Sequence, residues 1–242
     1  MIMAVKAKRI GAALPSLTLL SLILWACGGS KPEQPARASL AADPAPASGM
    51  RSPIDSVSDP RPVIAAFGDS LTAGYGVEPG RSYPDDLQRL IDADGYKYRV
   101  ANMGVSGDTT TDGVQRLPDV MAVKPVIVIL EFGGNDGLRG LPVSTTRANL
   151  IQMVQALQTA GVEVLLAGMT LPRNYGPDYI RSFEKVYLDV AAQFRLACIP
   201  FLLEGVGGHP DLMQADGIHP TAQGAEIVSS NVMKYLKPML KN

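Results

Sequence analysis

The stretch VIAAFGDSLTAG, residues 63–74, is an apolar run that ends abruptly in a glycine, an acid and a serine. The run Val63–Phe67 shows no polar alternation, which is typical of a strand buried on both faces of a parallel sheet. Ser70 follows the end of that strand. It is either a turn or helix-capping serine, the common use of this residue, or a nucleophile displayed at a strand end. The rest of the chain has to decide between the two.

Strands and helices alternate along the rest of the chain. Further apolar runs predict strands at Arg99–Met103, Val126–Phe132, Val162–Ala167 and Ala197–Leu203. Helical spacing predicts helices at Tyr83–Ala93, Asn149–Thr159, Asp178–Phe194 and Ala222–Leu240, and a segment near Thr110–Ala122 that Pro118 breaks. This pattern predicts an α/β domain of the doubly wound type, in which ligands bind outside the carboxyl ends of the strands.

The composition suits one globular domain with appendages. The 242 residues are 46% hydrophobic and 19% charged, and the net charge of −1 gives no sign of a nucleic-acid partner. Cys198 lies in an apolar run and is expected to be a buried, inert thiol. One such cysteine cannot build a disulfide framework, so stability has to come from the core. We expect a monomer.

Residues 1–26 are predicted to be a signal peptide. Basic residues among the first nine precede the 17 uncharged and mostly apolar residues Ile10–Ala26. A retained membrane anchor is the alternative. A spanning helix usually needs about 20 apolar residues, however, and Pro15 interrupts this run.

The end of this segment, Leu24-Trp25-Ala26-Cys27, resembles the lipobox of bacterial lipoproteins, although Trp25 departs from its usual pattern. The resemblance predicts an exported protein, attached to a membrane on the periplasmic side by a lipid on Cys27. The alternative is an ordinary cleavage site with a chance cysteine beside it. Residues 27–60 are predicted to form a disordered tether, because 18 of the 32 residues from Lys31 to Pro62 are Pro, Ala or Ser. The folded domain is expected at residues 61–242.

The distinctive polar and glycine-rich segments all follow predicted strands. Gly68-Asp-Ser-Leu follows the first strand, Asn102-Met-Gly-Val-Ser-Gly-Asp-Thr the second and Gly133-Gly-Asn-Asp the third. Asp216-Gly-Ile-His-Pro follows the fifth strand after a short loop. The carboxyl ends of parallel strands lie at one edge of the sheet, so these segments are expected to meet there.

A serine at this edge needs a base to act as a nucleophile, because its hydroxyl must lose a proton as it attacks. The chain has two histidines, His209 and His219. His219 follows Asp216 by three residues, close enough for the carboxylate to fix its tautomer, whereas His209 has no acid in that relation. We therefore predict a catalytic triad of Ser70, His219 and Asp216.

An acyl-transfer site also needs donors aimed at the oxyanion. Gly107 can bring its backbone N–H close to a substrate because it lacks a Cβ atom. Asn135 offers a side-chain amide, and the backbone N–H of Ser70 is a third candidate. Asp69 is expected to hydrogen-bond the turn, and Asp136 to be structural.

The blocks Gly-Asp-Ser-Leu, Ser-Gly-Asp-Thr, Gly-Gly-Asn-Asp and Asp-Gly-Ile-His resemble those of the SGNH, or GDSL, hydrolases, most of all the bacterial thioesterase I, lysophospholipase and arylesterase group. The resemblance runs from Val63 to about Leu236. It implies a flavodoxin-like three-layer αβα sandwich with five parallel strands in the order 2-1-3-4-5, and ester hydrolysis through an acyl-serine without metal or organic cofactor. The implied substrates are small esters with short to medium acyl groups, aryl esters, thioesters and lysophospholipids. Carbohydrate O-deacetylation is the alternative within the fold.

The substrate pocket is harder to predict. The loops Gly137–Pro142 and Leu171–Asp178 are candidates for its walls, and loop leucines also often pack under their own loops. The apolar candidates are Leu138, Leu141, Leu171 and Tyr175.

Two functions from other classes stay open. One is a nucleotide-binding module, since the glycines from Gly74 to Gly80 superficially resemble a dinucleotide loop, although their spacing is one residue too long. The other is a surface lipoprotein that binds acyl chains or glycans without catalysis.

Overall fold

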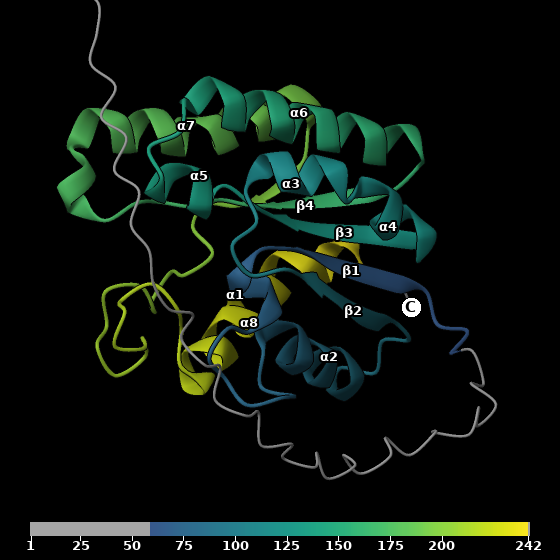
Figure 1. The fold of residues 1–242 in the computed structure, drawn as a ribbon. Coiled ribbons are helices and arrows are strands. Elements are labelled where there is room, and N and C mark those ends of the chain that lie inside the picture. The colour runs from purple at the N-terminus through teal and green to yellow at the C-terminus, as the bar shows by residue number, and fades with distance from the viewer. Residues whose placement is uncertain (1–58, 242) are drawn as a thin grey trace, which may run out of the picture. The chain divides into compact units, whose positions relative to one another are not determined.

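Five parallel strands form one sheet in the computed structural model, which describes residues 59–241 (Figure 1). The strands are β1 (Val63–Gly68), β2 (Arg99–Gly104), β3 (Pro125–Glu131), β4 (Glu163–Ala167) and β5 (Ala197–Ile199). Their order in the sheet is β2-β1-β3-β4-β5, which confirms the predicted topology. The predicted signal peptide, the tether up to residue 58 and Cys27 lie outside the described residues.

The sheet is covered on both faces. Helices α2 (Tyr83–Ala93) and α8 (Ala222–Leu236) pack together on one face (Figure 1). On the other face α6 (Val143–Thr159) packs against both α3 (Thr110–Gln115) and α7 (Pro177–Phe194). The shorter helices are α1 (Ser70–Ala73), α4 (Leu117–Ala122), α5 (Gly134–Leu138), and the 3₁₀ turns η1 (Arg173–Tyr175) and η2 (Lys237–Met239). The three layers are those of a doubly wound fold.

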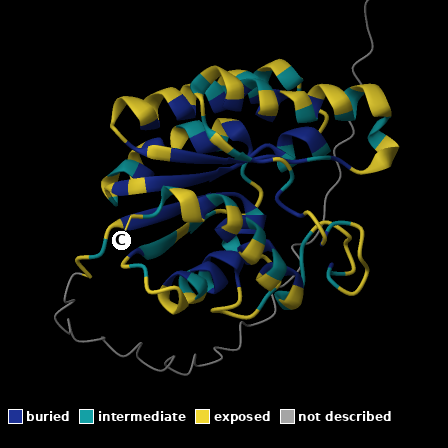
Figure 2. Cartoon of the chain, turned by 180° about the vertical axis from the view of Figure 1, so that it is seen from behind, coloured by how far each residue is buried: buried dark blue, intermediate teal, exposed yellow. Residues whose placement is uncertain are grey.

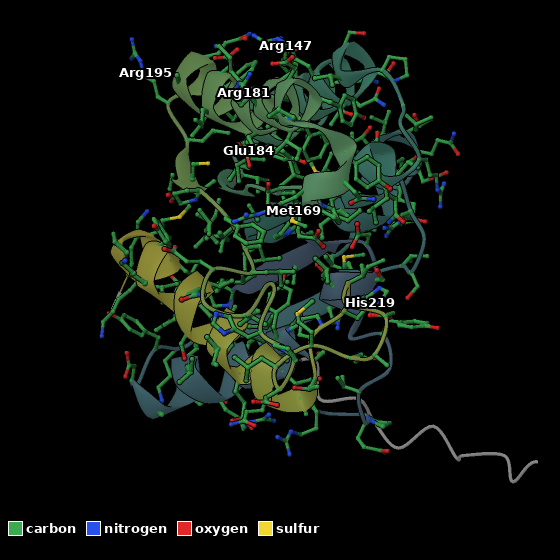
Figure 3. The ribbon with its side chains drawn as sticks, turned by 90° about the vertical axis from the view of Figure 1, so that its left-hand side faces the viewer. Arg147, Met169, Arg181, Glu184, Arg195 and His219 are labelled. Atoms are coloured by element: carbon green, nitrogen blue, oxygen red, sulfur yellow. The ribbon has the colours of Figure 1, made fainter. Side chains whose placement is uncertain are left out.

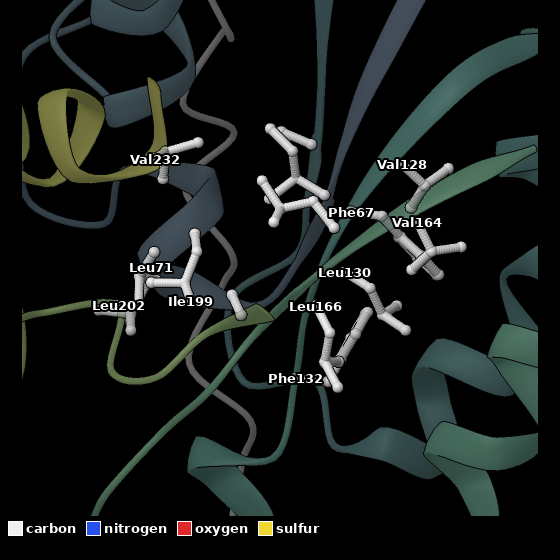
Figure 4. Packing of buried hydrophobic residues seen from close by; sticks show 14 of the residues in the cluster. Phe67, Leu71, Val128, Leu130, Phe132, Val164, Leu166, Ile199, Leu202 and Val232 are labelled. Carbon is white, nitrogen blue, oxygen red and sulfur yellow. The ribbon is translucent and has the colours of Figure 1, made fainter. Parts of the chain in front are cut away.

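The core lies along the central strands. Every residue of β1 is buried, and so are the residues of β3 from Ile127 onward (Figure 2). Figure 4 shows the apolar side chains that fill this region, where the rings of Phe67 and Phe132 meet edge to face with centroids 4.7 Å apart. Continuous apolar runs are expected here because both faces of these strands are covered.

The strand register aligns the segments that follow the strands. Gly68 at the end of β1 lies opposite Gly104 of β2 on one side and opposite Glu131 of β3 on the other. The residues that come next along each strand therefore leave the sheet at the same level. No helix between residues 59 and 241 combines the length and the apolar character that crossing a lipid bilayer requires.

Prolines explain most of the element boundaries that differ from the predicted ones. Pro200 has no N–H for a ladder, and β5 ends before it instead of reaching Leu203. The segment near Thr110–Ala122 is two helices, with Pro118 in the first turn of the second, where proline is accepted. Helix α8 ends at Leu236 instead of Leu240, and Pro238 lies in the 3₁₀ turn that follows it.

Helix α6 begins at Val143, six residues before the predicted start at Asn149. Its first turn, Val-Ser-Thr-Thr, has weak intrinsic helix propensity, so the local sequence does not predict a helix there. Tertiary packing fixes it instead: Thr146 is buried and donates a hydrogen bond to Asp136 of helix α5.

Candidate active site

Ser70 stands on a sharp turn between β1 and α1. The Asp69 carboxylate caps α1 by accepting the N–H of Leu71 at 3.1 Å, so the predicted turn hydrogen bond of Asp69 is confirmed. The turn sits very close to the neighbouring strand, because a Cβ atom on Gly104 would lie 2.1 Å from the backbone nitrogen of Ala73. A glycine at the end of β2 therefore lets the helix with the serine pack directly on the sheet.

Ser70, His219 and Asp216 are joined by hydrogen bonds. His219 Nε2 lies 2.8 Å from Ser70 Oγ, and His219 Nδ1 lies 2.7 Å from Asp216 Oδ2. The other carboxylate oxygen of Asp216 accepts the backbone N–H groups of Ile218 and His219 at 2.9 and 3.0 Å. The carboxylate thus holds both the ring and its backbone, which places the second ring nitrogen on the serine hydroxyl.

The Asp216 carboxylate is held in its charged form. Partial burial raises its pKa, but the hydrogen bonds from the His219 ring, the His219 N–H and the Ile218 N–H outweigh this and lower the pKa to about 2. His209, the other histidine, lies in an exposed loop after Gly207 and Gly208. The structure therefore brings together the predicted serine, histidine and acid, and leaves His209 outside.

The predicted oxyanion donors come from three strand ends. Gly107 has a φ angle of +89°, and its N–H has no acceptor among the described residues. Its carbonyl oxygen accepts a hydrogen bond from Arg139 Nη2 at 2.7 Å, which fixes the loop. Ser70 is the first residue of α1, where backbone N–H groups have no partner within the helix.

The amide of Asn135 has both of its hydrogens engaged. Its Nδ2 atom donates to Asp69 Oδ2 at 3.1 Å and to the carbonyl oxygen of Asp108 at 2.9 Å. A side-chain amide has two N–H donors, so Asn135 must give up or share one of these bonds to reach an oxyanion.

Behind the serine lie three fully buried acids, Asp69, Glu131 and Asp136, which we call the buried acid cluster. Glu131 Oε2 accepts the N–H of Asp69 at 3.2 Å and the hydroxyl of Thr72 at 2.8 Å. Burial and the neighbouring charge of Asp69 raise the pKa of Glu131 well above its usual range, and burial raises that of Asp69 to about 6.

Asp136 ties three helices together, as the structural role predicted for it implies. It accepts the N–H of Thr110 at 2.8 Å, the hydroxyl of Thr110 and the hydroxyl of Thr146 at 3.3 Å. The contacts therefore link α5 to α3 and α6, and they hold the segment that carries Asn135.

Arg116 is a supporting residue that the sequence did not point to. Its guanidinium lies 4.9 Å from the centroid of the Phe67 ring and donates to Asp108 Oδ2 at 2.6 Å. It also donates to the carbonyl oxygens of Met103 and Gly68, at 2.9 and 3.0 Å. One side chain thus ties the ends of β1 and β2 to the loop of Gly107. Arginine is usually a surface residue, so nothing in its sequence context predicts this place.

A largely apolar cavity of about 460 Å³ opens beside the serine. Leu138 and Leu171 line it, as predicted. Leu141 and Tyr175 do not. Their polar groups are engaged behind the wall, where the Tyr175 hydroxyl donates to the carbonyl oxygen of Leu138 at 2.8 Å and the carbonyl oxygen of Leu141 accepts from Tyr179 at 3.0 Å.

Several residues of the cavity wall were missed by the sequence analysis. They are Met169, Phe201, Leu203, Met213 and Ile218. Met169 and Phe201 follow β4 and β5, so the same rule that located Ser70 could have found them. Figure 3 shows Met169 near the centre of this side of the molecule and His219 on the loop that precedes α8.

The glycine-rich segment from Gly74 to Gly80 does not have the setting of a dinucleotide loop. Helix α1 separates it from β1, and Gly74 closes that helix with a left-handed φ of +79°. A dinucleotide loop would connect the strand directly to a helix N-terminus.

A serine hydrogen-bonded to a histidine that is in turn hydrogen-bonded to an aspartate, at the carboxyl edge of a parallel sheet, is the arrangement of a serine hydrolase with an α/β fold. Comparison with known proteins agrees with this class. The sequence profile of the GDSL-like Lipase/Acylhydrolase family matches residues 66–227. The chain belongs to this family.

Individual relatives cover most of the described domain. Esterase TesA of Pseudomonas aeruginosa is 47% identical over 178 residues, which are 73% of this chain and 89% of the relative. Thioesterase 1/protease 1/lysophospholipase L1 of Escherichia coli K12 is 37% identical over 180 residues, which are 74% of this chain and 85% of the relative. A crystal structure of TesA, 45% identical, superposes with a TM-score of 0.72 over 74% of this chain and 99% of the other.

Proposed function

We propose that Ser70 of this carboxylic ester hydrolase attacks esters and thioesters and carries the acyl group as a covalent intermediate. The observation that supports this best is the unbroken chain of hydrogen bonds from Ser70 Oγ through His219 to Asp216, at the mouth of an apolar cavity. The family and the relatives named as esterase, thioesterase and lysophospholipase support the same reaction.

In the first step Ser70 Oγ forms a bond to the carbonyl carbon while its proton passes to His219 Nε2. Asp216 stabilises the imidazolium, since its carboxylate stays charged and faces Nδ1. The developing oxyanion takes hydrogen bonds from the N–H groups of Gly107 and Ser70 and from the Asn135 amide. Collapse breaks the bond to the leaving oxygen or sulfur, which takes the proton from His219.

In the second step water attacks the acyl-serine, gives a proton to His219 and releases the acid, and the proton returns to Ser70 Oγ. The acyl group occupies the cavity throughout, among Leu138, Met169, Leu171 and Phe201. Such walls favour acyl chains over charged or sugar-like groups, because apolar surface is removed from water on binding.

The test is hydrolysis of p-nitrophenyl esters of graded acyl length by the full chain and by Ser70→Ala. We expect activity in the parent, loss in Ser70→Ala, and no change in the matched control Ser230→Ala, whose side chain is exposed on α8. Equal activity in Ser70→Ala would place the nucleophile elsewhere. Cleavage confined to acetyl groups on carbohydrates would favour an O-deacetylase.

We further propose that the protein is an exported monomer anchored by a lipid on Cys27, on the basis of the basic start, the apolar run and the lipobox-like segment. In cells fed radioactive palmitate, the parent is expected to carry the label and to sediment with membranes, whereas Cys27→Ala does neither. An unlabelled parent would leave ordinary cleavage as the explanation of this segment.

A further inference from the structure

An ester substrate has an acyl part and a leaving group, and each needs its own space beside Ser70. The acyl side stays on the serine, whereas the leaving oxygen must take a proton from His219 Nε2 and so lies next to the imidazole. The large cavity serves the acyl side in the proposed function. What lies against the imidazole therefore decides which leaving groups are favoured.

The side chain packed on the His219 ring is Tyr75. The two ring centroids are 4.6 Å apart and the planes are tilted by 43°. Tyr75 does not line the large cavity. It lines a separate hollow of only about 10 Å³ that also reaches Ser70. A leaving group is too large for that hollow, so the exposed face of Tyr75 and the His219 end of the large cavity are the surfaces that remain for it.

Tyr75 is 53% exposed, the second most exposed of the large hydrophobic residues in the described chain. Its backbone is nevertheless fixed. The Tyr75 N–H donates to the carbonyl oxygen of Ser70 at 3.0 Å, and Gln214 Nε2 donates to the carbonyl oxygen of Tyr75 at 2.7 Å. Gln214 also donates to the Pro220 and His219 carbonyl oxygens, through its side chain and its backbone respectively, so one residue holds the tyrosine and the histidine turn together.

Two more of the exposed large hydrophobic residues lie in the segments of the site. Ile218, 40% exposed, precedes His219, and Val105, 44% exposed, begins the loop of Gly107. Ile218 also lines the large cavity, so an apolar side chain borders His219 on the cavity side as well.

We propose that Tyr75 forms the leaving-group subsite and favours esters of flat aromatic alcohols. This rests on the proposed function, because it assumes that His219 protonates the leaving oxygen. An aryl group departing from the imidazole lies within reach of the tyrosine ring, and aromatic pairs prefer offset or edge-to-face contact. An ethyl group offers much less surface to this ring.

The experiment compares phenyl butanoate with ethyl butanoate, which share their acyl group, on the full chain and on Tyr75→Ala and Tyr75→Phe. Tyr75→Ala is expected to lower kcat/KM for the phenyl ester about 3- to 10-fold more than for the ethyl ester, as expected for the loss of one aromatic pair. Tyr75→Phe keeps the ring and should keep the ratio. Hydrolysis of the butanoyl-enzyme, followed by mass spectrometry after rapid quenching, should not change, because the leaving group has already gone.

The competing explanation is that Tyr75 only shields and orients His219. In that case Tyr75→Ala would slow both esters and the hydrolysis of the butanoyl-enzyme by the same factor, and the proposal would be overturned. An unchanged ratio without any loss of activity would overturn it as well. If the parent cleaved neither ester, the proposed function itself would fail, an outcome distinct from both.

Discussion

The exposed loop Asp216–His219 and the buried acid cluster both adjoin Ser70, but the pKa values of their carboxyl groups are shifted in opposite directions. Asp216 is exposed, yet donors from His219 and Ile218 keep its charge and lower its pKa to about 2. Asp69 is buried beside the serine, and burial raises its pKa to about 6. The acid adjacent to Ser70 in sequence therefore supports the turn and Asn135, while the acid that contacts the histidine comes from far along the chain.

The largest effect is expected from removing the base that the exposed loop holds. His219→Ala should lower kcat/KM by about 10⁴-fold or more, the size of loss seen when a triad member is removed. His209→Ala is the matched control and should stay within about twofold, since His209 is exposed and is not among the residues that line the cavity. The measurement is steady-state hydrolysis of p-nitrophenyl butanoate. Comparable losses in both variants would contradict the assignment of the base.

Asp216→Asn tests the charge of the exposed loop without changing its shape. We expect kcat to fall by about 10³- to 10⁴-fold, because an amide cannot stabilise the imidazolium and favours the wrong tautomer. The neighbouring Asp211→Asn serves as the control, because Asp211 is exposed and does not line the cavity. A loss that appears in KM alone would assign Asp216 to substrate binding instead.

The next prediction concerns Asn135, whose side-chain amide is held by Asp69 of the buried acid cluster. Asn135→Ala should lower kcat by about 10²- to 10³-fold with little change in KM, since one oxyanion donor is lost. Asp69→Asn should have a smaller effect in the same direction, because it replaces the acceptor that holds the Asn135 amide. The reverse pattern, a raised KM with kcat intact, would move Asn135 to ground-state binding.

The smallest effect concerns stability and pH. The native pKa of Asp69, about 6, lies above its usual value of 3.8, so the native state binds the proton more tightly than the unfolded chain. This contribution to stability is present below pH 4 and is lost as the pH rises towards 6. The free energy of unfolding is measured with urea at each pH for the parent and for Asp69→Asn. Relative to the variant, that of the parent should fall by about 1–3 kcal/mol across this range.

Asp216 should show the opposite sign. Its native pKa is lowered, so its stabilising contribution is present above pH 4 and is lost as the pH falls towards 2. If the free energy of unfolding of both Asp69→Asn and Asp216→Asn changed with pH just as that of the parent does, the two carboxyl groups would not have the opposite pKa shifts described here.

The sequence predicts the parts of the fold that local pattern controls. Continuous apolar runs identified all five strands, and the helix at Tyr83–Ala93 has the predicted bounds, because it carries a serine cap, a proline in its first turn and a regular apolar stripe. Helix α6 begins earlier than predicted because its first turn is held by tertiary contacts of Thr146, which no local signal records.

In the candidate site, too, local sequence patterns predict some residues, whereas the positions of others depend on tertiary packing. Ser70, Gly107, Asn135, Asp216 and His219 could be proposed because each follows a strand or forms a short motif. The cavity wall could be predicted only in part, since Leu141 and Tyr175 lie in the expected loops but have their polar groups engaged behind the wall. Arg116 was beyond prediction, because its place depends on packing against the Phe67 ring and on contacts with the ends of two strands.

The bond between Ser70 and His219 joins residues that are 149 positions apart in the chain. Helix α8, which follows the histidine directly, docks against α2, which follows the serine. The nucleophile is therefore synthesised long before its base. We expect hydrolysis to begin only once α8 has docked, because the loop that carries His219 leads directly into this helix, so the appearance of activity would report the completion of folding.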